Sequence, residues 1–284
     1  MTDTLTPTRS RRLVKILAGM PASDGAGVKL NRIIGQPALP DLDPFLMLDE
    51  FGSDDPAAYI AGFPTHPHRG FETVTYMLAG RMRHRDNAGN EGLLGPGSVQ
   101  WMTAGRGILH SEMPEQDAGL MQGFQLWVNL PAKDKMTDPR YQDIAADKVP
   151  TADLGDGASA KVLAGEIAGV RGPVDPGATQ PIFLDIALSP EASARVPLPE
   201  GHNAFAYVYE GAAVVGDPGE PLARGRIGVL SSGETVELAS TTGARLILVA
   251  GKPLREPVAK YGPFVMNTEA ELQQAFADLR AGKF

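Results

Sequence analysis

Glycine and proline interrupt this chain so often that long helices have little room to form. The sequence holds 33 Gly and 24 Pro among 284 residues, and both residue types are typical of turns rather than of helix interiors. Short segments rich in β-branched and aromatic residues lie between these turns, at the spacing typical of sandwiches and barrels: 71–78, 98–102, 124–130, 182–188, 204–209, 226–230, 234–238 and 245–249. The sequence therefore predicts an all-β fold.

Three stretches of the first half have weak counterparts in the second half, in the same order. The pairs are 74–80 with 205–211, 103–105 with 231–233, and 125–131 with 247–253, and the offset shrinks from 131 to 122 residues. Self-similarity at a nearly fixed offset indicates a repeated unit. We therefore expect two tandem β-barrels of the jelly-roll type, with shorter loops in the second. The alternative is that glycine-ended strands are alike by chance.

The boundary between the two copies is expected near Pro150, before a stretch rich in Asp and Gly. This division predicts a disordered tail at 1–11, an N-terminal domain at 12–150 and a C-terminal domain at 151–284. A single helix is expected at 268–281, because Thr268 and Glu271 form a capping-box pattern ahead of an apolar stripe with helical spacing: Leu272, Ala275, Phe276 and Leu279.

Composition excludes several classes of protein. The chain has no Cys, so disulfides, thiolate nucleophiles and cysteine metal sites are ruled out, and any metal must be bound by His and carboxylates. The net charge of −8 argues against direct binding of nucleic acid, which needs a basic surface. No apolar run is long enough for a membrane span, and residues 1–12 lack the apolar core of a secretory signal. We expect a cytoplasmic protein.

Two pairs of potential metal ligands share the same spacing. His66 and His68 lie two residues apart, and His110 and Glu112 repeat the arrangement. A β-strand sends residues i and i+2 to the same face, so two adjacent strands would direct all four side chains at one ion. Three nitrogens and one oxygen suit Fe, Mn, Ni, Co, Cu or Zn, and open coordination positions could accept a substrate and dioxygen. The alternative is that these histidines have only surface or structural roles.

Other candidates leave alternatives open. Glu72 shares strand parity with His66 and could replace Glu112 as the carboxylate ligand, although we favour Glu112 and expect Glu72 to support the ligands or the fold. His84 could point inward, but a surface position is favoured. His202 is interpreted as a turn residue. Trp101, Trp127, Met102 and Met121 are expected in the core, with a pocket wall as the alternative.

The predicted repeat offers an internal control for the metal site. Offsets of 131 and 128 residues carry the four candidate ligands to positions that cannot replace them: Pro197, Pro199, Leu238 and Ser240. One metal ion per chain is therefore expected, in the N-terminal half.

Four stretches resemble the pirin family, a branch of the cupin superfamily: 66–76, 95–113, 124–131 and 262–268. The resemblance implies a bicupin, with an N-terminal metal-binding cupin and a degenerate C-terminal cupin. It also implies one divalent ion, usually iron, at His66, His68, His110 and Glu112. Ni, Cu, Mn, Co and Zn stay open, because the affinity order of first-row ions lets them occupy such a site.

Pirins have two activities attached to them, and the resemblance does not choose between them. One is a quercetin 2,3-dioxygenase, which implies an Fe(II)-dependent enzyme that cleaves flavonols with O₂, with Glu112 also acting as a general base. The other is a non-catalytic, metal-dependent regulator of transcription that binds a protein partner. The enzyme is our leading hypothesis, with a phenolic compound as substrate. Another phenolic or enol compound in place of quercetin is a third hypothesis.

Overall fold

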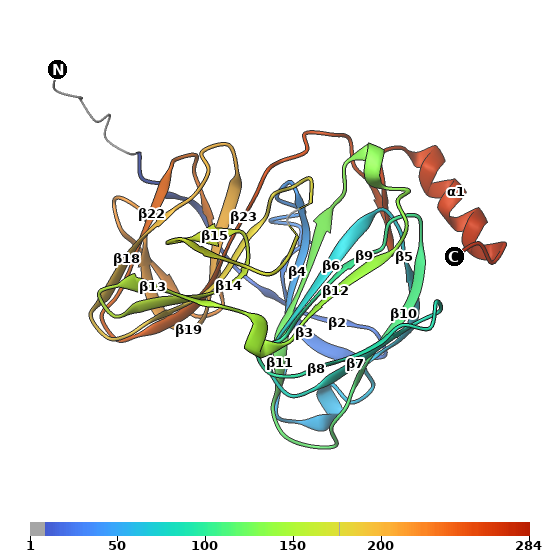
Figure 1. Ribbon diagram of the computed structural model, residues 1–284, viewed down its shortest axis with the longest axis horizontal. Helices are drawn as coiled ribbons and strands as arrows, with labels where there is room; N and C mark the ends of the chain where they lie inside the picture. Colours follow the sequence, from blue (N-terminus) through green and yellow to red (C-terminus); the bar gives the residue numbers. More distant parts are fainter. Residues whose placement is uncertain (1–8, 176) are drawn as a thin grey trace. The chain divides into compact units, whose positions relative to one another are not determined.

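The computed structural model describes residues 9–175 and 177–284 and divides into two compact units (Figure 1). The first barrel consists of Gly19–Val149 and Leu254–Phe284. The second barrel consists of Pro150–Pro253 with the N-terminal segment that ends at Ala18. Both are built of antiparallel strands, which confirms the all-β fold.

Two sheets form the first barrel. The larger sheet has the order β12-β9-β6-β11-β4-β3-β2 and the smaller one the order β5-β10-β7-β8. Short 3₁₀ helices η1 (Pro56–Ala58), η2 (Ala132–Asp134) and η3 (Ala146–Lys148) lie in the loops. The strands are β2 (Met20–Asp24), β3 (Val28–Ile34), β4 (Phe45–Ser53), β5 (Phe63–His68), β6 (Phe71–Ala79), β7 (Met82–Asp86), β8 (Glu91–Leu94), β9 (Val99–Thr103), β10 (Ile108–Pro114), β11 (Met121–Asn129), β12 (Arg140–Ile144), β24 (Ala259–Tyr261) and β25 (Phe264–Met266).

The second barrel is built around a sheet with the order β1-β21-β19-β23-β17-β14-β13. Strand β18 pairs with β22, while β22 and β20 both pair with the long strand β19. The strands are β1 (Leu13–Ala18), β13 (Thr151–Gly155), β14 (Ala158–Ala164), β15 (Glu166–Ile167), β16 (Val170–Arg171), β17 (Ile182–Leu188), β18 (Ala192–Pro197), β19 (Asn203–Val215), β20 (Glu220–Ala223), β21 (Arg226–Leu230), β22 (Thr235–Ser240) and β23 (Ala244–Gly251).

The two barrels repeat one strand order, as the weak sequence echoes predict. In the first barrel β9-β6-β11-β4-β3-β2 are neighbours, and in the second β21-β19-β23-β17-β14-β13 follow in the same sequence. An edge strand completes each series, β12 beside β9 and β1 beside β21. Chance similarity does not produce the same order of six strands, so the chain contains two copies of one barrel.

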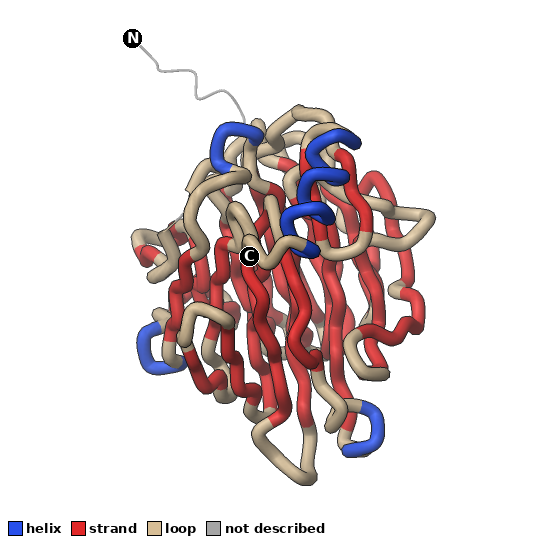
Figure 2. Tube along the Cα trace, turned by 90° about the vertical axis from the view of Figure 1, so that its right-hand side faces the viewer, coloured by secondary structure: helices blue, strands red, loops and turns tan. Residues whose placement is uncertain are grey.

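The C-terminal helix α1 (Glu269–Arg280) forms where the sequence predicts it and lies outside the strands (Figure 2). Thr268 is the N-cap, and its side chain and that of Glu271 make both hydrogen bonds of a capping box. The helix packs on β24 and β25 of the first barrel through its apolar side. An ion pair of 2.9 Å between Arg69 and Asp278 adds a polar contact.

The predicted domain limits need correction at both ends of the chain. Strand β1 pairs with β21, so residues 12–18 belong to the second barrel rather than to the N-terminal domain. The segment from Leu254 onward, with α1, belongs to the first barrel. Residues 1–8 of the predicted disordered tail lie outside the described residues, but Arg11 is fully buried and donates hydrogen bonds to three backbone carbonyls.

Side-chain alternation places the core inside each barrel. In β18 of the second barrel every second residue is buried and apolar, and in β22 Val236 and Leu238 alternate in the same way. These side chains join one large apolar cluster. In the described part of the chain, no helix has the length and apolar character needed to cross a membrane.

Candidate metal centre

Strands β5 and β10 bring the three predicted imidazole ligands together. The two strands pair antiparallel, with His110 opposite His66 and Ile108 opposite His68. Directly opposed residues project from the same face of a sheet, and so do residues i and i+2. His66, His68 and His110 therefore point into the barrel together, and their candidate ligand atoms lie within 4.8 Å of one another.

The loop after β5 holds His68 in place. Gly70 has a φ of +88°, and a Cβ atom there would lie 2.0 Å from the carbonyl oxygen of Val265, so only glycine fits. The buried Lys135 donates hydrogen bonds of 2.7 Å and 3.0 Å to the carbonyls of Gly70 and Val265. The Trp127 ring packs edge-on against His68 at 5.2 Å between centroids.

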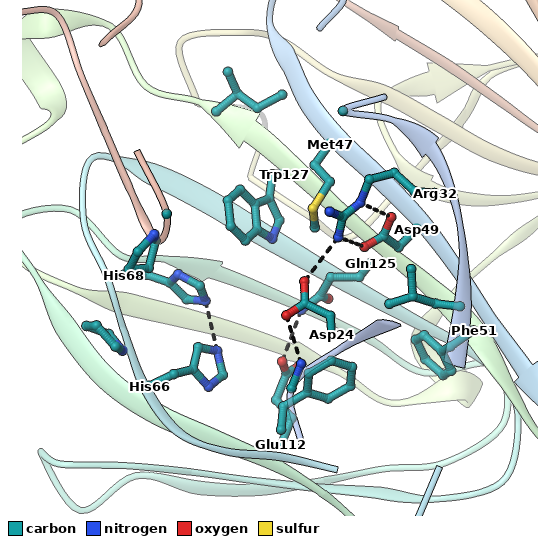
Figure 3. A pocket seen from close by; sticks show the side chains of 18 of the residues that line it. Asp24, Arg32, Met47, Asp49, Phe51, His66, His68, Glu112, Gln125 and Trp127 are labelled. Atoms are coloured by element: carbon teal, nitrogen blue, oxygen red, sulfur yellow. Dashed lines mark hydrogen bonds and ion pairs between the residues drawn. The ribbon is translucent and has the colours of Figure 1, made fainter. Parts of the chain in front are cut away.

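The ring nitrogens are arranged as ligands of one ion would be. Nε2 of His66 and Nε2 of His68 are 3.0 Å apart (Figure 3). Two nitrogens bound at about 2.1 Å from one ion and at a right angle to each other would be separated by about 3.0 Å. Nδ1 of His66 lies 2.8 Å from the carbonyl of Pro64, which can accept its proton and leave the lone pair of Nε2 free for a metal.

Burial keeps two of these imidazoles neutral. Desolvation lowers the pKa of His68 well below its usual value, and the neighbouring His66 lowers it further. Desolvation also lowers the pKa of His110, with smaller contributions from His68, His66 and His84. Only a neutral imidazole has a lone pair for a metal, so this environment favours the ligand form.

The residues present fit a transition-metal ion. Both ring nitrogens of His110 are buried and have no hydrogen-bond partner among the described residues. A buried polar atom without a partner is costly in a native fold unless a ligand, ion or water satisfies it. Three convergent imidazoles are typical ligands for Zn, Fe, Ni, Cu or Co. The described residues include no other group of three or more His, Cys, Asp or Glu side chains within such a distance.

The predicted carboxylate ligand lies nearby but is not part of the three-histidine group. Glu112 is buried on β10, and its Oε1 accepts a hydrogen bond of 2.9 Å from Thr75. Its Oε2 accepts one of 3.0 Å from the side-chain amide of Gln125 (Figure 3). The alternative carboxylate, Glu72, is buried on β6 and accepts a hydrogen bond of 2.6 Å from Thr103.

Of the two other histidines, His84 differs from its predicted surface position, whereas His202 lies at a turn, as expected. His84 is not on the surface, because β7 places it on the inner face directly opposite Glu112, and it is only 1% exposed. The alternation of buried and exposed residues in Met82–Asp86 explains the position. His202 lies at a bend but is largely buried, and its Nε2 is 3.1 Å from the carbonyl of Gln180.

A pocket of about 760 Å³ opens beside His66 and His68, in the size range of small-molecule sites. Trp127 lines it, while Trp101, Met102 and Met121 are buried core residues. One group of its lining residues is apolar: Leu30, Leu46, Met47, Phe51, Phe63 and Trp127. The other is polar: Asp24, Arg32, Asp49, Glu112, Gln125 and Lys260.

The polar wall of this pocket was not predicted from the sequence. Arg32 binds Asp49 through two hydrogen bonds of 2.9 Å and 2.7 Å and reaches Asp24 at 3.0 Å. Burial raises the pKa of Asp49, while Arg32 acts in the opposite direction. In the register of the larger sheet, Arg32 is opposite Asp49, and Asp49 is opposite Gln125. The sequence does contain a signal for this wall, because its polar residues occupy inward-facing positions of otherwise apolar strands.

The second barrel has other residues at the positions of the candidate ligands. Leu238 lies opposite Ala194 in the β18–β22 pair, as His110 lies opposite His66 in the β5–β10 pair. The four ligand positions therefore correspond to Ala194, Val196, Leu238 and Ser240. The expected correspondence of His66 and His68 to Pro197 and Pro199 is wrong, because the loop lengths differ between the copies.

Two copies of one barrel, with convergent imidazoles inside the first, define a bicupin. The family model for pirin matches residues 27–128, and that for the pirin C-terminal cupin domain matches residues 183–284. The chain belongs to the pirin family.

Similar proteins cover nearly the whole chain. A pirin-like protein of Caulobacter vibrioides is 50% identical over 275 residues, which are 96% of this chain and 99% of that protein. Human pirin is 42% identical over 281 residues, covering 96% and 94%. The crystal structure of a quercetin 2,3-dioxygenase from Acinetobacter baumannii has a TM-score of 0.89 at 35% identity and covers 96% of this chain and 98% of that one.

Proposed function

We propose that this protein is a metal-dependent dioxygenase that cleaves a flavonol such as quercetin with O₂. The observation that carries the proposal is the group of three convergent imidazoles, two of them buried, beside a pocket large enough for a drug-sized ligand. The similarity to a solved quercetin 2,3-dioxygenase supports the same reaction. A location in the cytoplasm, and Fe(II) as the native ion, stay predictions.

The charges of the pocket suit a singly charged substrate. Asp24, Asp49 and Glu112 bring three formal negative charges. Arg32 and Lys260 bring two positive ones, so the pocket has a formal charge of −1. A divalent ion would reverse this to +1, which one ionised hydroxyl of a phenolic substrate would neutralise. Burial lowers the pKa of Lys260, which is consistent with a partly desolvated pocket.

In the proposed mechanism His66, His68 and His110 are the neutral ligands, with Glu112 as the candidate for a fourth. A first-row ion, when bound, supplies redox chemistry with O₂ and positive charge for an anionic oxygen of the substrate. Glu112 accepts the proton of the substrate 3-hydroxyl as general base. The flat rings pack on the apolar wall near Trp127, while Arg32 and Gln125 can bind hydroxyl groups. Ring cleavage releases CO.

The proposal is tested with purified, iron-loaded protein and quercetin. We expect loss of quercetin absorbance together with O₂ uptake, and loss of both in His66→Ala. His202→Ala removes an imidazole from the second barrel and serves as the matched control, with turnover and bound iron retained. Absence of turnover in iron-loaded protein would contradict the enzyme and leave the predicted regulatory role. Turnover in His66→Ala after its iron is lost would refute the mechanism.

Substrate screening separates quercetin from the other phenolic and enol compounds predicted as alternatives. The apolar wall and the single compensating charge favour flat, singly ionised phenols over polyanionic ones. We expect kcat/KM to be higher for flavonols with a free 3-hydroxyl than for flavones that lack it.

A further inference from the structure

The end of the pocket remote from the imidazoles is built around Arg32. Figure 3 shows its guanidinium apart from the imidazoles, with Trp127 between them. In the larger sheet Arg32 is opposite Asp49, and Asp49 is opposite Gln125, so Arg32 lies two strand spacings, or about 10 Å, from Gln125. The Gln125 amide donates a hydrogen bond of 3.0 Å to Glu112, a candidate metal ligand. A substrate with three rings can therefore reach from the metal centre to Arg32.

The protein uses only part of the Arg32 guanidinium. Nε and Nη2 donate hydrogen bonds of 2.9 Å and 2.7 Å to the two oxygens of Asp49, and Nη2 also donates one of 3.0 Å to Asp24. Among the described residues, Nη1 has no acceptor, so its two N–H groups are unused. The side chain of Arg32 is 26% exposed, whereas that of Asp49 is 3% exposed. Asp49 thus fixes the guanidinium, and Nη1 is available to a ligand in the pocket.

Asp24 supplies a hydrogen-bond acceptor beside this donor. Its Oδ2 accepts the hydrogen bond from Arg32, and its Oδ1 accepts one of 2.8 Å from the backbone N–H of Gly25. A carboxylate has about four acceptor positions, so Asp24 has capacity for a ligand. The side chain is 52% exposed and lines the pocket. A donor and an acceptor side by side suit hydroxyl groups, which both accept and donate, on an aromatic ring.

The charges at this end of the pocket favour a neutral hydroxyl over an anionic group. Arg32 and Lys260 balance Asp24 and Asp49, so these four residues have a formal charge of zero. Burial lowers the pKa of Lys260, and the positive charge of Arg32 acts in the same direction, so the two cations lie near each other. An anionic substituent would add an unbalanced charge to a partly desolvated wall, which is costly, whereas a hydroxyl adds none.

We propose that Arg32 and Asp24 form a subsite for hydroxyl groups on a substrate ring remote from the metal, and that the subsite selects polyhydroxylated flavonols. Nη1 of Arg32 donates to a hydroxyl oxygen, and the Asp24 carboxylate accepts a hydrogen bond from a hydroxyl group. The ring packs on Met47 and Trp127, which are opposite each other in the sheet beside the polar row. The proposal rests on the proposed function for the class of substrate. The alternative is that Arg32 only ties β3 to β4.

The test is calorimetric titration of Zn(II)-loaded protein freed of excess ion, because Zn(II) has no redox chemistry and binding is then measured without turnover. The probes are quercetin and 3-hydroxyflavone, which has the same ring skeleton and the 3-hydroxyl but no other hydroxyl group. We expect the unmodified protein to bind quercetin about tenfold more tightly than 3-hydroxyflavone. Asp24→Ala should weaken quercetin binding about tenfold, as the loss of one hydrogen bond to a charged group does, and change 3-hydroxyflavone binding by less than about twofold.

A second variant tests the donor, and a third serves as the control. Arg32→Lys keeps a positive charge beside the buried Asp49 but replaces the forked guanidinium by a single nitrogen, so it should also weaken quercetin selectively. Asp117→Ala is the matched control for Asp24→Ala, because Asp117 is an exposed carboxylate of the first barrel that does not line the pocket. It should leave both affinities unchanged.

Two results would overturn the subsite. Equal weakening of both probes by Asp24→Ala would mean that Asp24 only shapes the wall, and unchanged quercetin binding would mean that it does not contact the ligand. Turnover of quercetin by iron-loaded protein is measured separately. Selective loss of quercetin binding in a protein without turnover contradicts the dioxygenase but not the subsite, whereas turnover without this selectivity contradicts the subsite alone.

Discussion

The two barrels of this chain share one strand order but differ in what fills them. Inside the first, β5 and β10 present His66, His68, His110 and Glu112 next to a pocket of about 760 Å³. Inside the second, the corresponding pair presents Ala194, Val196, Leu238 and Ser240, and the three apolar side chains belong to a large apolar cluster. The comparison shows that the scaffold forms without the imidazoles, which are therefore an addition to it.

The buried imidazoles lower the stability of the metal-free first barrel. A buried polar group without a hydrogen-bond partner destabilises a fold by about 1–3 kcal/mol, and both ring nitrogens of His110 are in this state. The pocket also removes packing contacts that the second barrel retains. We infer that the first barrel is less stable than the second when no metal is bound, and the predictions below test this difference.

The largest effect is expected from a cavity in the filled barrel. Leu248 is fully buried on β23, and Leu248→Ala should lower the free energy of unfolding by about 3 kcal/mol. Met47→Ala in the pocket wall is the comparison, and it should cost less than half as much, because one side of Met47 already faces the pocket. Chemical unfolding measures both. Equal losses would show that the first barrel is packed as tightly as the second.

An intermediate effect is expected from pH. In the folded, metal-free protein the pKa values of His68 and His110 are lowered, mainly by burial. At pH values below the ordinary histidine pKa of about 6.5 the unfolded chain binds protons that the folded chain does not. The free energy of unfolding should therefore fall as the pH falls, by about 2 kcal/mol between pH 7 and pH 5.5 for the two groups together.

The pH dependence is checked by unfolding metal-free protein at several pH values. His110→Leu should remove about half of the slope, because only His68 would remain of the pair. A free energy of unfolding that stays constant or rises on acidification would contradict the assigned burial of these imidazoles.

The smallest effect is expected from making the first barrel resemble the second. His110→Leu introduces the residue that Leu238 provides at the corresponding position, and it should abolish metal binding while raising the stability of the metal-free protein by about 1 kcal/mol. His202→Leu is the control, and it should destabilise the fold because the nearby carbonyl of Gln180 loses its partner. Thermal unfolding compares the two variants, and destabilisation by His110→Leu would mean that the imidazole has a structural partner.

Local patterns were sufficient to predict much of the fold. All eight predicted strand segments overlap observed strands, and the capping box of Thr268 and Glu271 forms as expected. The shared face of His66 and His68 follows from their two-residue spacing, because strand geometry determines which side chains share a face, whereas His110 joins them only through the pairing of β5 with β10. The features predicted from local patterns depend on residues close together in the sequence.

Features that depend on pairing between distant strands could not be predicted in this way. The burial of His84 results from the pairing of β7 with β10, and the hydrogen bonds that hold Glu112 come from two strands of another sheet. Likewise, no local pattern indicates that β1 pairs with β21. Register across a sheet is determined by the whole fold rather than by one segment.

The N-terminal segment of the chain belongs to the second barrel and the C-terminal segment to the first. This arrangement determines which barrel can finish folding first during translation. The first barrel includes Leu254–Phe284, so its last elements leave the ribosome only after the complete second barrel has been translated. During that interval the loop at Gly70 lacks the Val265 contact that supports it in the finished fold. The second barrel, in contrast, has its borrowed strand β1 available from the start of translation. The barrel that carries the imidazoles is thus the later of the two to be completed.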